Sequence, residues 1–327
     1  MFGVDIVSTG IYLPDKKISN FDLEKIMDTS DEWIYQRTGI KYRYVVEDGV
    51  STSDLALFAS KQALEKAKEK GVNDIDYIVL ATNSPDYIIP ATSSVLQGKL
   101  GINAGTFDIF SGCTAFVYAL IVCASLIKSG LARNILLVGS ESISKYLDWH
   151  DRTVSILLGD GAGAFVLSQS ENPNKGIIDY NVGSDGTKAE LIYIPAGGTK
   201  EVFSYQALEN KRVYIKMQGR EVFKNVVSLI PQEIKKILNK NNMDANDVDL
   251  YIFHQANIRI IEAIAESLKI DPRKIYTNIE NYANTSSASV PIVFHEAYNK
   301  GMIKESSLVF FSAFGAGLTW ANVLWKI

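Results

Sequence analysis

The sequence contains few of the residues that usually mark a metal or redox protein. Its 327 residues include two cysteines and three histidines, and neither type occurs in pairs at the spacing of a zinc site. A Walker phosphate-binding motif and a Rossmann dinucleotide fingerprint are missing as well. The sequence therefore predicts no bound metal and no nucleotide cofactor that acts in redox chemistry.

Long apolar runs and a strong charge of one sign are also missing. The longest apolar run covers residues 114–127, which is short for a membrane span and suits a buried helix. Residues 1–5 include no basic stretch followed by an apolar core, so we expect no signal peptide. The two cysteines fit a reducing compartment, and we expect a cytoplasmic protein. The net charge of −4 argues against nucleic-acid binding as the main function.

What remains is the composition of a globular protein with a large core. Hydrophobic residues make up 47% and charged residues 21% of the chain, and helix-like and strand-like segments alternate throughout. Residues 53–70 have the periodicity of an amphipathic helix that Gly71 ends, and residues 77–81 form a short apolar run typical of a buried strand. This alternation predicts a layered α/β fold.

The same order of elements returns later in the chain. Residues 219–240 read as a helix and residues 248–253 as a strand, and the entries to the two strands are similar: NDID at 73–76 and NDVD at 246–249. A second pair is GAG at 161–163 and at 315–317. Two pairs of similar short sequences in the same order favour an internal duplication. We predict one half over residues 1–172 and another over residues 173–327.

Cys113 is the first candidate for chemistry. It lies between a strand-like segment at 107–110 and a helix-like run that continues to about residue 129. At the start of a helix, unpaired backbone N–H groups favour a thiolate and stabilise an oxyanion. The alternative is a buried structural cysteine, which is the interpretation that we favour for Cys123.

A thiol nucleophile needs polar partners, and the histidines are few. His254 follows a strand, and functional residues gather at the carboxyl ends of strands in α/β folds. His150 lies in a polar run and His295 in an expected helix, so we interpret both as solvated or structural. Asn284 precedes the run TSSAS, which is typical of a turn before a helix cap and leaves its amide free to serve a site.

Together these motifs resemble the β-ketoacyl-[acyl carrier protein] synthase III family. The resemblance covers the whole chain and rests on several motifs in order: TSDEWI at 29–34, RTGI at 37–40, Cys113 on its turn, GDGAGA at 159–164, MQGREVFK at 217–224, HQANIR at 254–259, NTSSASVP at 284–291 and FGAGLTW at 314–320.

The resemblance implies a thiolase fold, in which two pseudo-duplicated halves form a five-layered αβαβα sandwich, and a homodimer. It implies that Cys113 takes an acyl group from acyl-CoA and that His254 and Asn284 assist decarboxylative condensation with malonyl-acyl carrier protein. The backbone N–H groups of Cys113 and Ala316 would form the oxyanion hole. Acyl-CoA is then a substrate, and neither a cofactor nor a metal is required. Nucleic acid and membrane are not expected partners.

The resemblance also implies binding residues at matching positions. Those for CoA are Trp33, Arg37, Thr38, Arg152, Gly219 and Asn257. Those for the acyl carrier protein are Lys224, Gln255, Ala256, Asn257, Ile258 and Arg259.

Three positions depart from the usual pattern of the family. Ala115 and Ala316 stand where glycine is frequent, and aliphatic Ile89 stands near a position that is often aromatic. The favoured function is the start of type II fatty-acid synthesis from acetyl-CoA or a short branched acyl-CoA. The alternatives are a related condensing enzyme of secondary metabolism, a Cys-His thioester hydrolase and a non-catalytic carrier-binding subunit.

Overall fold

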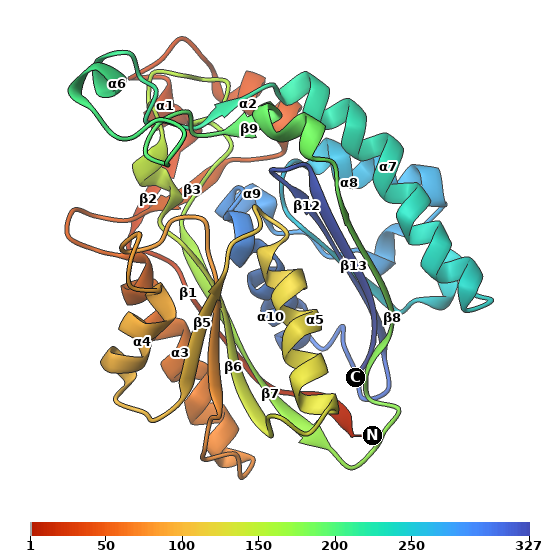
Figure 1. Ribbon diagram of the computed structural model, residues 1–327. Coiled ribbons are helices and arrows are strands. Elements are labelled where there is room, and N and C mark those ends of the chain that lie inside the picture. The colour runs from red at the N-terminus through yellow and green to blue at the C-terminus, as the bar shows by residue number, and fades with distance from the viewer. Residues whose placement is uncertain (1) are drawn as a thin grey trace.

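Two β-sheets organise the molecule, which we describe from a computed structural model for residues 2–327 (Figure 1). The first sheet has the strand order β1-β7-β6-β4-β5. Strand β1 is antiparallel to β7 and β7 to β6, whereas β6, β4 and β5 run parallel. Its strands are β1 (Gly3–Tyr12), β4 (Tyr77–Ala81), β5 (Gly105–Ile109), β6 (Asn134–Glu141) and β7 (Gly161–Ser170).

The second sheet repeats this pattern from its antiparallel edge. Its order is β8-β13-β12-β11, with β8 antiparallel to β13, β13 antiparallel to β12 and β12 parallel to β11. The strands are β8 (Gly176–Ser184), β11 (Leu250–Phe253), β12 (Leu308–Gly315) and β13 (Thr319–Lys326). A single parallel bridge from Tyr251 to Ile275 occupies the position that β5 takes in the first sheet.

Helices separate and cover the sheets to give five layers (Figure 1). The central layer is α5 (Ala115–Lys128) and α10 (Ser289–Asn299), which pack between the sheets in one apolar core. The outer layers are α3 (Thr52–Glu69) with α4 (Thr92–Leu100) on the first sheet, and α7 (Gly219–Lys240) with α8 (Ile258–Leu268) on the second. The αβαβα thiolase fold expected from the resemblance is confirmed.

The boundaries of these helices follow from local chemistry. Ser51 and Asp54 form a capping box at the start of α3, which satisfies backbone donors that the helix leaves unpaired. Gly71 follows that helix with a φ of +83°, a conformation that other residues adopt only at a cost. The residues of α5 that face the two sheets are buried, whereas Val122 and Ser125 on another side of the helix are exposed. None of the helices in residues 2–327 is both long and apolar enough to cross a bilayer.

The remaining elements gather mostly at one end of the layers, where strand β5 leads into helix α5 (Figure 1). They include short helices, 3-10 turns and two small two-stranded sheets, β2 with β3 and β9 with β10. Their bounds are β2 (Lys16–Ser19), β3 (Tyr42–Val45), β9 (Ile192–Tyr193), β10 (Lys216–Met217), α1 (Asn20–Leu23), α2 (Asp31–Thr38), α6 (Tyr205–Glu209), α9 (Ile279–Tyr282), η1 (Ile143–Tyr146), η2 (Gly186–Leu191), η3 (Ala245–Asp247), η4 (Pro272–Lys274) and η5 (Ser286–Ala288).

The predicted boundary between residues 172 and 173 falls in the connection from β7 to β8, which passes from the first sheet to the second. The NDID and NDVD runs precede β4 and β11, which hold equivalent places in the two sheets. The GAG run at 161–163 begins strand β7, whereas the run at 315–317 begins at the last residue of β12 and continues into the turn to β13. The two runs thus lie near equivalent connections but at different positions along them. The matching strand orders support the division into halves, which stays a proposal.

Candidate active site

Cys113 lies where β5 passes into α5, at a turn that requires glycine. Gly112 has a φ of +56°, and a Cβ there would come within 2.8 Å of the Ala316 backbone nitrogen. A Cβ at Gly315 would come within 2.5 Å of the Cys113 nitrogen. The glycines thus let the β5–α5 turn lie directly against the β12–β13 turn. This proximity brings the backbone N–H groups of Cys113 and Ala316 to one place.

The Cys113 sulfur lies in a buried environment that opposes its ionisation. Burial is the largest influence on its pKa and raises it to about 11. The Ser286 hydroxyl donates a hydrogen bond to Sγ over 3.5 Å and acts in the opposite direction. The start of α5 was expected to favour the thiolate. That effect is outweighed here because the surrounding protein atoms shield the sulfur from bulk water, although Cys113 is in part exposed to the cavities that it borders.

His254 follows β11, and hydrogen bonds fix both its backbone and its imidazole ring. Its N–H donates to the Ser312 carbonyl (2.8 Å), and its Nδ1 lies 2.6 Å from the Ser289 hydroxyl. The ring also meets the edge of Phe314 at a centroid distance of 5.4 Å. Burial lowers the pKa of His254 to about 3, so the imidazole is neutral near pH 7.

The bond to Ser289 determines which ring nitrogen carries the proton. The Ser289 oxygen accepts a hydrogen bond from the Gln255 N–H (3.4 Å), so its own proton is available for Nδ1 of His254. A neutral imidazole that accepts at Nδ1 carries its proton on Nε2. The second ring nitrogen of His254 is therefore a hydrogen-bond donor.

The side chain of Asn284 is oriented in a similar way. Its Oδ1 accepts the backbone N–H of Ser286 (2.8 Å), and its own backbone N–H donates to the Leu157 carbonyl (2.9 Å). With the carbonyl oxygen engaged, the amide presents its NH₂ group as a donor. Imidazole and amide thus both supply neutral N–H donors, which suits them to stabilise negative charge on an oxygen.

These three side chains, from segments far apart in the sequence, line one cavity. Cys113, His254 and Asn284 all border a space of about 490 Å³. Cys113 and Asn284 also border a second space of about 550 Å³, whose walls are largely apolar and include Ile143, Leu158 and Ile215. The sulfur is therefore reachable from two cavities. One has Arg37, Arg220 and Arg259 on its wall and is called the polar cavity below, and the other has no charged side chain on its wall and is called the apolar cavity.

The side chains predicted to bind CoA lie around the polar cavity, although not all on its walls. Arg37, Thr38, Gly219 and Asn257 line it, whereas Trp33 and Arg152 lie outside the lining. The guanidinium carbons of Arg37 and Arg152 lie 4.5 and 5.2 Å from the Trp33 ring. Trp33 is therefore a stacking platform with cations on it, a suitable surface for an adenine ring.

The predicted docking patch needs correction at one position. Gln255 is buried, and its amide is engaged with the Phe253 carbonyl and the Asn278 N–H, so its side chain cannot touch a docked protein. Ile258 begins helix α8, packs against the apolar cluster around Ile40 and is partly exposed. Its place in the docking patch stays a prediction.

The other residues of the predicted patch lie at or near the cavity mouth. Lys224 and Arg259 are exposed, and Ala256 and Asn257 line the cavity. The sequence interpretation missed Arg220, an exposed cation that also lines the cavity. It stands in the MQGREVFK run, so the run that pointed to Lys224 could also have indicated it.

The two alanines that replace frequent glycines have different surroundings. Ala115 is buried in the core between the sheets and lines neither cavity. Ala316 borders the apolar cavity next to Cys113, with its backbone nitrogen near Gly112. The methyl group of Ala115 therefore affects helix packing, whereas that of Ala316 faces the site.

Comparison with known proteins agrees with this geometry. Residues 107–186 match the family described as 3-oxoacyl-[acyl-carrier-protein (ACP)] synthase III, and residues 238–327 match the C-terminal part described for the same enzyme. The β-ketoacyl-[acyl-carrier-protein] synthase III of Caldanaerobacter subterraneus subsp. tengcongensis is 45% identical over 98% of this chain and 97% of its own. The protein of the same name from Aliarcobacter butzleri is 44% identical over 98% and 96%.

Solved structures give the same result for the fold. The crystal structure of 3-oxoacyl-[acyl-carrier-protein] synthase III from Aquifex aeolicus superposes with a TM-score of 0.89 at 40% identity. The superposition covers 99% of this chain and 100% of that one. Sequence similarity and fold therefore extend over essentially the whole chain, and the chain belongs to the β-ketoacyl-[acyl-carrier-protein] synthase III family of condensing enzymes.

Proposed function

We propose that this chain starts type II fatty-acid synthesis by joining an acyl group from acyl-CoA to malonyl-acyl carrier protein. The observation that carries this proposal is the meeting of Cys113, His254 and Asn284 at one cavity. A thiol is a suitable acyl acceptor, and two neutral N–H donors suit an enolate oxygen.

In the first half-reaction, Cys113 attacks the thioester carbonyl of acyl-CoA. A new S–C bond forms, the bond to the CoA sulfur breaks, and the thiol proton ends on the released CoA. The transient oxyanion would accept hydrogen bonds from the backbone N–H groups of Cys113 and Ala316. The proximity of the two turns at Gly112 and Gly315 supports this assignment.

In the second half-reaction, malonyl-acyl carrier protein takes the place of CoA. Loss of CO₂ leaves an electron pair on the α-carbon and negative charge on the thioester oxygen. His254 Nε2–H and the Asn284 amide would donate to that oxygen. The carbanion then attacks the acyl-Cys113 carbonyl, and the S–C bond breaks with its electron pair on sulfur. 3-Oxoacyl-acyl carrier protein leaves, and the Cys113 thiolate takes a proton from water to restore the thiol. No cofactor enters either half-reaction.

The starter group is assigned to the apolar cavity. Its walls offer no charged group beside the sulfur, and side chains such as Val154 and Met217 suit an alkyl chain. Acetyl-CoA or a short branched acyl-CoA is the proposed starter. A panel of starter CoA thioesters with malonyl-acyl carrier protein, with products identified by mass, decides among starters. A product pattern without short chains would contradict this assignment.

A homodimer is the proposed assembly. Strand β5 is an edge of the first sheet, and Phe110 just after it is 73% exposed. The nearby loop exposes Ile88 and Ile89 by 89% and 86%. An unpaired edge beside large exposed apolar side chains is a suitable surface for a second copy.

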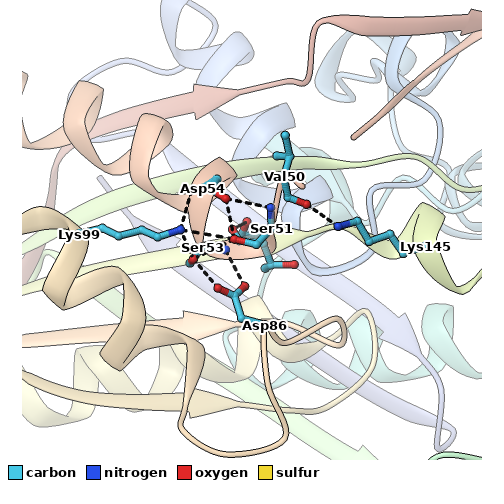
Figure 2. Close-up of polar contacts among 9 residues, drawn as sticks. Val50, Ser51, Ser53, Asp54, Asp86, Lys99 and Lys145 are labelled. Atoms are coloured by element: carbon cyan, nitrogen blue, oxygen red, sulfur yellow. Dashed lines mark hydrogen bonds and ion pairs between the residues drawn. The ribbon is translucent and has the colours of Figure 1, made fainter. Parts of the chain in front are cut away.

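The exposed loop is anchored at its base by a polar network (Figure 2). Asp86 accepts hydrogen bonds from the N–H (2.9 Å) and the hydroxyl of Ser53 in the first turn of α3. Lys99 donates to the same hydroxyl (2.7 Å) and to Asp54 (2.5 Å). The base of the loop is thus fixed while its apolar tip is exposed, as a docking element requires.

The carrier protein is proposed to dock at the exposed cations Lys224 and Arg259, where charge accelerates the encounter with an acidic partner. A cytoplasmic location is proposed from the two free cysteines, Cys113 and Cys123. Nucleic acid and membrane are not among the proposed partners.

Among the alternatives, a condensing enzyme of secondary metabolism would use the same chemistry with another starter or extender. A thioester hydrolase would release free acid from acyl-CoA alone, and the two donors facing an enolate position speak against it. A non-catalytic subunit would not need Cys113. Condensation by the purified chain alone would exclude that last alternative.

The test of the proposed function separates the half-reactions. We expect Cys113→Ala to take no covalent label from radiolabelled acyl-CoA. His254→Ala and Asn284→Ala should still take the label and should decarboxylate malonyl thioesters poorly. Label that persists on Cys113→Ala, or unchanged decarboxylation in the other two variants, would refute the assigned roles.

A further inference from the structure

Ser286 has a backbone conformation that serine rarely adopts. Its φ is +51°, in the left-handed region, and it is 3% exposed. A residue other than glycine in this region is strained and persists where surrounding contacts fix it. The contacts of Ser286 are its N–H to Asn284 Oδ1 (2.8 Å) and its hydroxyl to Cys113 Sγ (3.5 Å). The conformation thus brings one side chain to the nucleophile.

The direction of the Ser286 hydroxyl is determined by Asn83. The Asn83 amide Nδ2 lies 3.1 Å from Ser286 Oγ, 2.9 Å from the Gly112 carbonyl and 2.8 Å from Glu141 Oε1. An NH₂ group only donates, and its two protons serve these three acceptors, so the Ser286 oxygen shares one of them with a neighbouring acceptor. The Ser286 oxygen is thus an acceptor here, and its own proton is left for the sulfur. The Asn83 Oδ1 is buried and has no partner, as expected if its donors determine the orientation of the amide.

Glu141 in turn holds Asn83. It ends strand β6 and is fully buried, and both of its oxygens lie 3.1 Å from the Asn83 backbone nitrogen. Its other donors are the hydroxyls of Thr82 (3.3 Å), Ser84 (2.6 Å) and Ser287 (2.7 Å). A buried carboxylate with this many donors is a fixed acceptor. If the Asn83 amide were turned, its Oδ1 would face this carboxylate.

We infer that Glu141, Asn83 and Ser286 form a hydrogen-bond chain that positions a hydroxyl donor on the Cys113 sulfur and so favours the nucleophile for the first half-reaction. The inference rests on the proposed role of Cys113 as the acyl acceptor. Glu141 and Asn83 are positioning residues, because they act on the sulfur through Ser286, which itself contacts the sulfur and lines the apolar cavity.

The surroundings of the sulfur oppose its ionisation, so a hydrogen-bond donor is needed to favour the thiolate. Burial of the site is the largest influence and raises the pKa of Cys113. The Ser286 hydroxyl lowers this pKa, and the Glu141 carboxylate raises it. His254, which follows β11 and lines the same cavity as Cys113, is neutral. The other titratable groups on the walls of the two cavities are Arg37, Tyr193, Arg220 and Arg259. The Glu141 carboxylate orients the Asn83 amide, and this amide in turn directs the Ser286 hydroxyl toward the Cys113 sulfur.

The test measures the thiol itself. Iodoacetamide alkylates Cys113 by forming an S–C bond and releasing iodide after the thiol proton has gone to solvent, and the rate follows the thiolate population. The full chain is compared with Ser286→Ala over pH 7 to 10, with modification at Cys113 read by mass spectrometry. Cys113→Ala gives the background from Cys123. Ser125→Ala, on the exposed part of α5, is the matched control.

We expect Ser286→Ala to raise the apparent pKa of Cys113 by about one unit. Because a thiolate of higher pKa is also more nucleophilic, alkylation at pH 7 should slow about three- to fourfold. Ser125→Ala should leave the pH profile unchanged. Asn83→Ala removes the amide donors without adding a charge and should shift the profile in the same direction as Ser286→Ala.

An unchanged profile in both Ser286→Ala and Asn83→Ala overturns the inference, as does an equal shift in Ser125→Ala. Melting curves identify a variant that fails to fold, and the other of the two variants then decides. Acyl-CoA labelling of the wild-type chain is measured separately. If that labelling is absent, the proposed function fails, whereas the alkylation comparison still judges the hydrogen-bond chain.

Discussion

At the residue scale, the buried sulfur makes acylation depend strongly on pH. The pKa of Cys113 is raised to about 11 by burial, so the thiolate is the minor form throughout the neutral range. Below that pKa, its population rises about tenfold with each pH unit. Single-turnover acylation, followed by release of CoA, should therefore accelerate steadily from pH 6.5 to 9. A rate that levels off near pH 7 would show that the thiol ionises more easily than its burial predicts.

His254 leads to the opposite expectation for the second half-reaction. Its pKa is lowered to about 3, so its charge does not change between pH 6 and 8. Decarboxylation of malonyl thioesters, measured as CO₂ release, should be flat over that range. His254→Ala removes an N–H donor and should slow this step by about 10²- to 10³-fold. A sigmoidal pH profile that is lost in His254→Ala would contradict a neutral imidazole.

Ser289→Ala should have a smaller effect on the same decarboxylation step. Loss of its hydroxyl leaves Nδ1 without the partner that places the proton on Nε2, so decarboxylation should slow less than in His254→Ala. Alkylation of Cys113 should remain as in the wild type. The serines at 286 and 289 thus serve different half-reactions.

The sequence was sufficient to propose Cys113, His254 and Asn284, because each follows or precedes a regular element at a recognisable motif. It was not sufficient to find Glu141 or Asn83. Glu141 looks like the polar end of an apolar strand. Its partners include Ser287, 146 positions away, and such a contact exists only after the two halves pack together.

At the element scale, the periodic helices were the best predicted part of the fold. The helix predicted at 53–70 is α3 at Thr52–Glu69, and the one predicted at 219–240 is α7 at Gly219–Lys240. Their apolar stripes are local in the sequence. Strand order is different, because pairs such as β8 with β13 join segments more than 130 residues apart. For that information the family resemblance was needed.

Asp86 provides a test of how elements hold the exposed loop (Figure 2). Its carboxylate accepts the Ser53 N–H at the start of α3, where a helix has unpaired donors. Asp86→Ala should destabilise the protein by about 1 to 2 kcal/mol, as loss of a helix cap does. Urea unfolding measures this change. Asp28→Ala removes a fully exposed carboxylate and should leave the midpoint unchanged; equal midpoints for both variants would mean that the network adds no stability.

At the scale of the whole molecule, the five layers bring two chemically different entrances to one sulfur. One cavity has cations on its walls and the other is largely apolar, and Cys113 borders both. This arrangement separates the carrier from the starter group. It requires both halves of the chain, because the first contributes the thiol and the second contributes the imidazole and the amide.

The cations at the polar entrance should affect the carrier protein and not the thiol chemistry. Lys224→Glu and Arg259→Glu place negative charge where an acidic partner approaches, so the KM for malonyl-acyl carrier protein should rise several-fold and its dependence on salt should weaken. Acylation from a short acyl thioester that lacks the CoA phosphates should change less, because this substrate carries no negative charge. Lys68→Glu, an exposed residue of α3 on the opposite outer layer, makes the same charge change away from the entrance. If all three variants raised KM equally, net charge rather than a docking surface would govern the encounter.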